Sequence, residues 1–224
     1  MDAQDQVEQN ENAPVYKNLR VFNIVMSFFH LIQAGAMLWV SNAFALPITT
    51  SYLKFDVATK SISTNPEELF KLQIGPVIAG FLLLSAIAHA LLASPVIYEW
   101  YVRNLKRKIN YARWWEYAFS SSLMLVVIAL LCGFYDFGGL ILLFTLNATM
   151  NFWGLMMELH NQTTQKTNWT AFLFGCLAGI VPWIVLALYF YGAIANVAEN
   201  VPSFVYWILA SLFLFFNCFA INMF

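Results

Sequence analysis

Apolar residues along the chain gather in six long runs, and polar stretches separate these runs from one another. Each run is close to the roughly 20 residues that an α-helix needs to cross the hydrocarbon core of a bilayer. We therefore predict an all-α membrane protein, a bundle of six transmembrane helices that forms one domain over residues 20–224. The predicted helices lie near residues 20–43, 70–94, 107–133, 137–159, 170–193 and 202–224.

Two polar regions lie outside this pattern. Residues 1–19 carry four acidic side chains among glutamines and asparagines, and this composition predicts a disordered tail. The second region is the longer loop Leu46–Glu68 between the first two predicted helices. Because its segment Ile48–Leu53 contains β-prone residues, a short β-hairpin outside the membrane is expected there.

Only 10% of the 224 residues are charged and 61% are hydrophobic, whereas a soluble domain carries about 25% charged residues. The chain is therefore expected to be solvated by the lipid bilayer, and its 21 Phe and 8 Trp suit the aromatic belts of a membrane bundle. A net charge of −1 gives no reason to expect a nucleic-acid partner. The three cysteines lie inside apolar runs, where they are expected to act as small packing residues.

Lysine and arginine are distributed unequally over the two ends of the predicted helices. Eight of the eleven fall at the end that holds the N-terminus, and the other three lie in or beside the first loop. Since cytoplasmic loops are enriched in these residues, we predict a cytoplasmic N-terminus and an integral location in the plasma membrane. The eight are Lys17, Arg20, Arg103, Lys106, Arg107, Lys108, Arg113 and Lys166.

The third predicted helix carries one carboxylate, Glu116. An ionised group in hydrocarbon is costly, so this residue is a candidate functional site. The alternative is that Glu116 sits near the interface and reaches water or headgroups. A rise of about 1.5 Å per residue places it roughly 14 Å from the start of its helix. The same arithmetic puts His30 and His89 in the same half of the first two helices.

These residues predict a hydrated polar cavity on the cytoplasmic side of the bundle. Gln33, Ser85 and Ser121 lie close to the ionisable residues along the same helices, and Asn147 adds an amide in the fourth helix. The alternative is that each histidine is a packing residue that hydrogen-bonds to a neighbouring helix.

Other chemistry is weakly represented. No histidine or cysteine pair has metal-ligand spacing, so no metal is expected. Neither a glycine-rich phosphate loop nor a serine nucleophile elbow occurs, so no enzyme is expected. In the sixth helix, Phe213 and Phe216 either line an aromatic pocket or face lipid, and their periodicity does not decide between these alternatives.

Several segments together resemble one family, the heliorhodopsins, which are retinal proteins with a cytoplasmic N-terminus, opposite to other microbial rhodopsins. The resemblance runs from about Arg20 to the end of the chain. It implies a rhodopsin-like fold of seven helices, here without the seventh. The segments that carry it are Phe29–Gln33, Phe44–Thr49, Leu84–His89, Arg113–Ser122, Leu146–Met150, Gly175–Trp183 and Ser211–Asn217.

The resemblance also implies roles for single residues and a cofactor, all-trans retinal. Glu116 would be the Schiff-base counterion, and Ser121 would lie beside the Schiff base. The polar cluster would consist of His30, Gln33, Ser85, His89 and Ser121. The retinal pocket would be formed by Tyr117, Asn147, Met150, Phe213 and Phe216.

The chain departs from the family pattern in one respect. The family's seventh helix, with its retinal-binding lysine, has no counterpart, and none of the seven lysines lies in the middle of a predicted helix. The chain is therefore expected to hold no covalent retinal, either as a C-terminally truncated product or as a natural variant that has lost the chromophore. Truncation is favoured because Glu116 would otherwise have no buried cation as a partner.

The function that the resemblance implies is light sensing rather than ion pumping. An ion path needs polar groups on both sides of the chromophore, yet the third helix is apolar from Leu123 to Leu131. A light-driven or light-gated ion conductor and a retinal-free structural subunit are the alternatives. The family and the edge-strand composition of the first loop further imply a symmetric homodimer that uses this loop and the fourth and fifth helices. The sequence does not identify a signalling partner.

Overall fold

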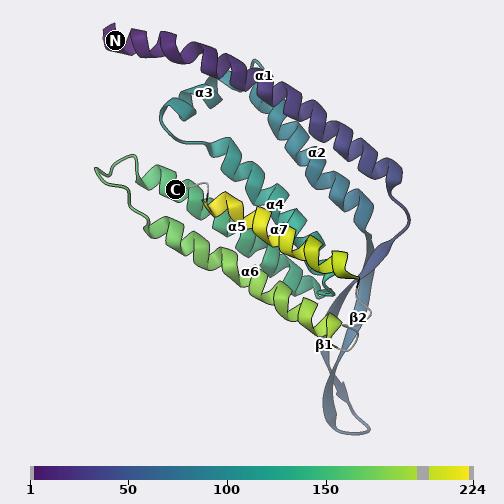
Figure 1. The fold of residues 1–224 in the computed structure, drawn as a ribbon. Helices are drawn as coiled ribbons and strands as arrows, with labels where there is room; N and C mark the ends of the chain where they lie inside the picture. Colours follow the sequence, from purple (N-terminus) through teal and green to yellow (C-terminus); the bar gives the residue numbers. More distant parts are fainter. Residues whose placement is uncertain (1–2, 196–201, 222–224) are drawn as a thin grey trace.

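The computed structural model describes residues 3–195 and 202–221, and the side chains of residues 16–195 and 202–218. The chain forms a bundle of helices with a β-hairpin that projects from one end (Figure 1). The helices are α1 (Ala3–Val40), α2 (Ile74–Ala93), α3 (Tyr98–Lys106), α4 (Tyr111–Leu131), α5 (Phe137–His160), α6 (Thr170–Ile194) and α7 (Ser203–Ile221). The strands are β1 (Ala45–Asp56) and β2 (Ser61–Gln73).

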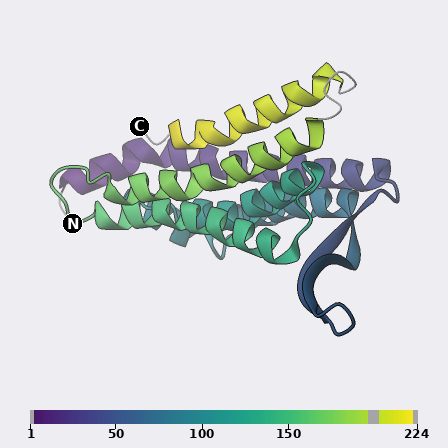
Figure 2. The same ribbon diagram turned by 90° about the horizontal axis from the view of Figure 1, so that it is seen from below.

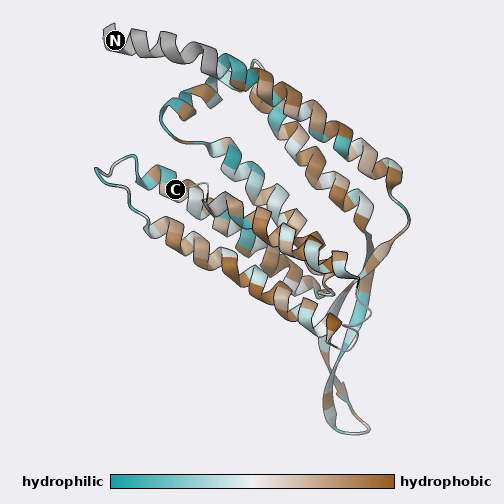
Figure 3. Ribbon diagram, viewed as in Figure 1, coloured by the Kyte–Doolittle hydropathy of each residue, from teal (hydrophilic) through white to brown (hydrophobic). Residues whose placement is uncertain are grey.

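The predicted helical membrane fold is confirmed. Within the described residues, five helices are long and apolar enough to cross a membrane, namely α2, α4, α5, α6 and the part of α1 from Tyr16 to Val40. The last predicted span corresponds to α7, whose described apolar part, Ser203–Cys218, is shorter. Hydrophobic residues run along all these helices (Figure 3).

The helices pack in chain order, with α1 on α2, α2 on α4, α4 on α5 and α5 on α6. Aromatic side chains join α7 to α6, since Trp183 meets the rings of Phe213 and Phe216 edge to face. The apolar core lies near the hairpin, where the second half of α4 packs against the first half of α5 and the middle of α6. Leu125, Leu130 and Leu186 are almost completely buried there.

The hairpin is longer than the short one that the sequence predicted. Its strands pair antiparallel from Ala45 opposite Gln73 to Asp56 opposite Ser61, with an irregularity after Ile48. Consequently residues 70–73, predicted to begin the second helix, belong to β2 instead. At the base Ile48 is buried in the core, whereas residues 51–66 are exposed and extend away from the bundle (Figure 2). Extending the ladder satisfies the backbone groups of these residues, which explains the greater length.

The tip of the hairpin is fixed by Asp56. Its Oδ1 accepts hydrogen bonds from the backbone N–H groups of Ala58 at 2.8 Å and Thr59 at 3.3 Å. The bond from Ala58 and the contacts with Thr59 lower the pKa of the Asp56 carboxyl below its usual value. Lys60 follows with a left-handed φ of 52°, which closes the turn.

The third predicted helix, near residues 107–133, begins later than expected. Residues 98–106 form the separate helix α3, and α4 starts only at Tyr111. Two local causes separate the helices: Lys108 adopts a left-handed φ of 58°, and Asn110 caps α4 by accepting a hydrogen bond from the Arg113 N–H at 3.1 Å.

Helix α1 begins at Ala3 and so includes most of residues 1–19, the stretch for which the sequence predicts a disordered tail. Extending an existing helix adds one hydrogen bond for each residue ordered and avoids the cost of nucleation. The glutamine and glutamate residues of this stretch also have favourable helix propensity.

Candidate functional site

A cavity of about 500 Å³ opens among α1, α2, α4, α5 and α7. It contains seven of the residues singled out from the sequence. Four helices supply them, α1, α2, α4 and α7, and the lining combines polar with aromatic side chains. These seven are His30, Ser85, His89, Glu116, Tyr117, Ser121 and Phe216.

Glu116 lies in the second turn of α4 and is half-buried. Its Oε1 accepts a hydrogen bond from the Ser85 hydroxyl at 2.5 Å, which joins α4 to α2. Because α4 begins at Tyr111 rather than near residue 107, Glu116 lies about 7.5 Å along its helix instead of the predicted 14 Å. It is therefore closer to the helix start than expected, but it lines the cavity.

The two histidines form a stacked pair on the same cavity. Their rings are 5.6 Å apart between centroids, with an angle of 15° between planes. His89 Nδ1 lies 2.7 Å from the Asn23 Oδ1, and His30 Nδ1 lies 3.0 Å from the Gln33 Oε1. Each amide oxygen can accept a hydrogen bond from an N–H group of the ring. The Asn23 and Gln33 side chains therefore favour the tautomer in which Nδ1 carries the proton. Gln33 thus acts through His30 and does not itself line the cavity.

A second polar network lies at the wall of the cavity, between α4 and α5. The Ser121 hydroxyl accepts hydrogen bonds from the Asn147 amide at 2.9 Å and the Asn151 amide at 3.2 Å, and donates one to the Tyr117 carbonyl at 2.6 Å. Asn147 also donates to the Ser122 hydroxyl at 3.0 Å. Asn147 and Asn151 are 1% and 2% exposed, so this network replaces water for both amides.

Three members of the predicted retinal pocket do not line this cavity. Asn147 belongs to the network between α4 and α5, and the other two line different cavities. Met150 lines a separate cavity of about 540 Å³ among α4, α5, α6 and α7. Phe213 contacts the Trp183 ring and lines an apolar cavity between α6 and α7. The structure therefore does not bring these three residues into the cavity that holds Glu116.

Sequence reasoning missed two asparagines. Asn23 is 2% exposed and supports His89, and Asn151 lines the cavity. Helical spacing could have revealed both, since Asn23 precedes His30 by two turns and Asn151 follows Asn147 by one turn.

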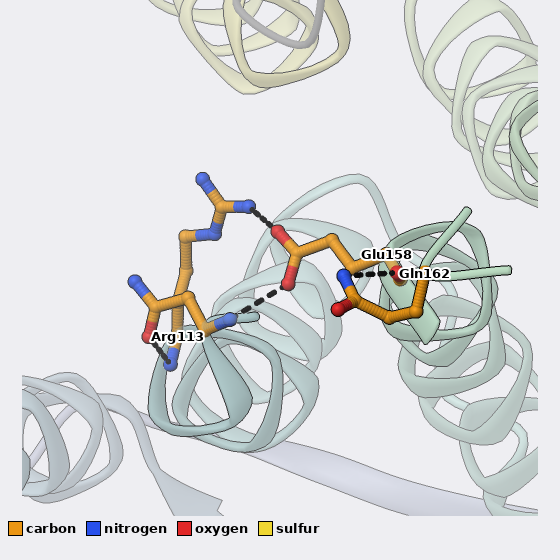
Figure 4. A network of polar contacts seen from close by, with 4 residues as sticks. Arg113, Glu158 and Gln162 are labelled. Carbon is orange, nitrogen blue, oxygen red and sulfur yellow. Dashed lines mark hydrogen bonds and ion pairs between the residues drawn. The ribbon is translucent and has the colours of Figure 1, made fainter. Parts of the chain in front are cut away.

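An ion pair between Arg113 and Glu158 joins α4 to α5. The sequence did not predict this pair, because nothing in it indicates that Glu158 lies beside Arg113. The Arg113 guanidinium donates to Glu158 Oε1 at 2.5 Å, and Glu158 Oε2 accepts from the Asn110 N–H at 2.7 Å (Figure 4). Arg113 also stacks over the Trp114 ring. The carboxylate of Glu158 therefore ties the start of α4 to the end of α5.

Comparison with models of known protein families identifies the family of this chain. A family model described as Heliorhodopsin matches residues 19–224. The chain belongs to the heliorhodopsin family. No curated protein matches it at a significant level. Because it belongs to this family and has membrane-spanning helices, this heliorhodopsin is a rhodopsin-like integral membrane protein. The family is associated with the retinal chromophore.

The cavity of this heliorhodopsin combines apolar side chains with one carboxylate. Phe22, Met26, Phe81 and Phe215 add apolar walls, and Glu116 supplies a carboxylate. A lysine is needed for covalent attachment, but none of the seven lysines lines this cavity.

Proposed function

We propose that this heliorhodopsin is a light-sensing, retinal-binding membrane protein and that its cavity houses the cationic end of the chromophore. The observation that carries the proposal is the placement of Glu116. A carboxylate that is half-buried between membrane helices, held by Ser85 and surrounded by aromatic side chains is costly unless a cation faces it.

Retinal, when bound, supplies the absorption of visible light and a change of shape. In this proposal Glu116 acts as counterion and Ser85 fixes its orientation. The stacked pair of His30 and His89, which lines the same cavity, holds or releases a proton. Their amide partners keep each ring in one orientation. The aromatic side chains that line the cavity, including Tyr117 and Phe216, lie beside the polyene.

A sensor is favoured over the alternative of an ion conductor. The polar groups gather at one end of the bundle, whereas the second half of α4 forms part of the dry core. Leu125 and Leu130 have no exposed surface there. A conducting path would need polar side chains through that region as well. A retinal-free structural subunit is the other alternative, and the experiment below separates it from a photoreceptor.

We propose that the protein lies in the plasma membrane with its N-terminus in the cytoplasm. The unequal distribution of basic residues supports this orientation. Lys54, Lys60 and Lys71 all lie in the hairpin, at the opposite end of the bundle from α3 and the start of α1 (Figure 1). Arg103 and Lys106 lie in α3 itself. The basic end is the one expected in the cytoplasm.

The proposal can be tested with the chain as it stands by supplying the missing amine. All-trans retinal condensed with butylamine forms an imine that becomes a cation when its nitrogen is protonated, and it needs no lysine. The 224-residue chain should bind it saturably and hold a visible absorption band at neutral pH. In Glu116→Gln, the pH at which half of this band is lost should fall by about one to three units, because the cation loses its partner.

The matched control is Glu67→Gln, which changes the same residue type on the hairpin and should leave the titration unaltered. An unchanged titration in Glu116→Gln would remove Glu116 as counterion. Absence of saturable binding would favour the retinal-free subunit. Free all-trans retinal should leave no visible band after denaturation, because no lysine lines the cavity.

A further inference from the structure

The short helix α3 lies at the surface of the membrane. Only residues 94–97 separate it from α2, and only residues 107–110 separate it from α4. Both neighbours are long and apolar enough to span a bilayer. Whatever the tilt of the bundle, α3 is therefore within a few residues of the lipid headgroups.

One face of α3 is anchored to the bundle. Tyr101 and Asn104 are 6% and 7% exposed. The Tyr98 hydroxyl donates to the Tyr16 carbonyl of α1 at 2.7 Å. Burial raises the pKa of the Tyr101 hydroxyl, while the side chains of Asn110 and Asn23 act against this shift. These contacts fix the rotation of α3, so its opposite face is directed outward.

The outward face combines an aromatic ring with cations. Trp100 is 40% exposed, and Arg103 and Arg107 follow it by three and seven residues, which places them on the same side of the helix. Lys106 and Lys108 are exposed beside them. Exposed Val96 extends the apolar edge towards α2. A mixed aromatic and basic face is the pattern of helices that lie in a membrane interface.

The cations of this face outnumber its carboxylates, since Glu99, four residues before Arg103, is the acidic side chain of α3. Among the residues whose side chains the structure describes, ion pairs join Lys54 to Glu67 and Arg113 to Glu158, and none involves the cations of α3. Lys106 instead lies over the Tyr16 ring, 5.7 Å from its centroid. Exposed Lys17 adds a further positive charge on α1 nearby.

We propose that α3 and the adjoining residues 107–108 form a binding site for anionic phospholipid headgroups. The basic side chains would contact the phosphate and the negatively charged headgroup, and Trp100 and Val96 would lie against the upper acyl chain. The apolar edge favours a lipid over free phosphate, since inorganic phosphate would gain nothing from it. The proposal depends on the chain spanning a membrane and is independent of retinal binding.

The test titrates the purified 224-residue chain in detergent with phosphatidylglycerol and, separately, with phosphatidylcholine, and counts bound lipids by native mass spectrometry. Each cation near an anionic surface strengthens binding by roughly five-fold. The variant Arg103→Gln/Lys106→Gln/Arg107→Gln/Lys108→Gln should therefore bind phosphatidylglycerol at least about ten-fold more weakly. Binding of phosphatidylcholine should not change.

Two controls separate the site from total charge. The hairpin variant Lys54→Gln/Lys60→Gln/Lys71→Gln also removes positive charge and should keep the phosphatidylglycerol preference. The charge-preserving variant Arg103→Lys/Arg107→Lys should keep it too. An equal loss in the hairpin variant, or no loss in the α3 variant, would overturn the proposal.

A second measurement needs no variant and so does not depend on folding of the altered chain. Phosphatidylglycerol binding to the unaltered chain should weaken as salt is raised, because exposed charges are screened. Binding that ignores salt would contradict the proposal. Competition by millimolar inorganic phosphate would identify a phosphate site instead of a lipid site and would also contradict it.

Discussion

Charged side chains between the helices are held by partners from other parts of the chain. Glu116 depends on Ser85 of α2, and Glu158 depends on Arg113 and the Asn110 N–H. The two carboxylates differ in one respect: Glu158 has a cation beside it, whereas Glu116 faces a cavity. That difference is the physical reason why we expect Glu158 to contribute to stability and propose a functional role for Glu116.

The Arg113–Glu158 pair should contribute measurably to stability. Glu158→Gln keeps the shape of the side chain but removes the charge, and the Arg113 side chain, 28% exposed, would lose its ionic partner. We expect the free energy of unfolding to fall by about 2 kcal/mol, the usual value for a hydrogen bond to a charged group. Thermal unfolding in a mild detergent measures this loss.

The hairpin supplies the matched control for this prediction. Glu67→Gln breaks the ion pair with Lys54, whose side chains are 56% and 43% exposed. An exposed pair of this kind contributes about 0–1 kcal/mol. If both variants lose the same free energy of unfolding, the Arg113–Glu158 pair contributes no more to stability than an exposed ion pair.

Close packing of α4 on α5 depends on one glycine. A Cβ atom built on Gly154 would lie 2.1 Å from ring atoms of Trp114, and Trp114 is only 1% exposed. The ring therefore occupies the space above the glycine and cannot move aside without opening the α4–α5 contact. The absence of a side chain at Gly154 is what lets the indole fit between the two helices.

Gly154→Ala should destabilise the bundle by about 1–3 kcal/mol, the range for overpacking a well-packed interior. The measurement is again thermal unfolding in mild detergent. Gly35→Ala in α1 makes the same chemical change where no atom lies within 4 Å of the new Cβ. It should be neutral or stabilising by up to about 1 kcal/mol, because alanine is the better helix former. A stabilising effect of Gly154→Ala would contradict the assigned packing role.

The molecule exposes apolar side chains that can contact either the bilayer or another protein chain. On the hairpin, which projects beyond the bundle (Figure 2), Leu53 and Phe55 are 77% and 62% exposed. On the lipid-facing side of α5, Leu142 is 72% exposed. Exposed strand edges with apolar side chains invite pairing with another chain. We propose that these surfaces join two copies in a symmetric homodimer.

The mass of the protein in mild detergent should therefore correspond to two chains. Leu53→Lys/Phe55→Lys places two charges on the hairpin and should shift the population towards monomer, as measured by light scattering after size-exclusion chromatography. Ser51→Lys/Ser63→Lys adds the same charge at exposed polar positions and should have a smaller effect. Monomers alone for the unaltered chain would make this prediction wrong.

Much of this architecture was determined by local sequence. Runs of about 20 apolar residues have few stable alternatives to membrane helices, because backbone groups must be satisfied internally in lipid. The same reasoning located α5, at 137–160 against the predicted 137–159, and α6, at 170–194 against the predicted 170–193. His30, Ser85, His89, Glu116 and Ser121 also stood out because polar residues are rare in such runs.

The tertiary structure decided what the runs alone could not. The length of the hairpin depends on pairing between two strands, and the start of α4 is held to α5 by the hydrogen bond from the Asn110 N–H to Glu158. Asn23, Asn151 and the Arg113–Glu158 pair gained their roles only when different helices met. Periodicity describes one helix at a time, whereas a cavity is made by side chains from several helices, so its members are fixed by packing.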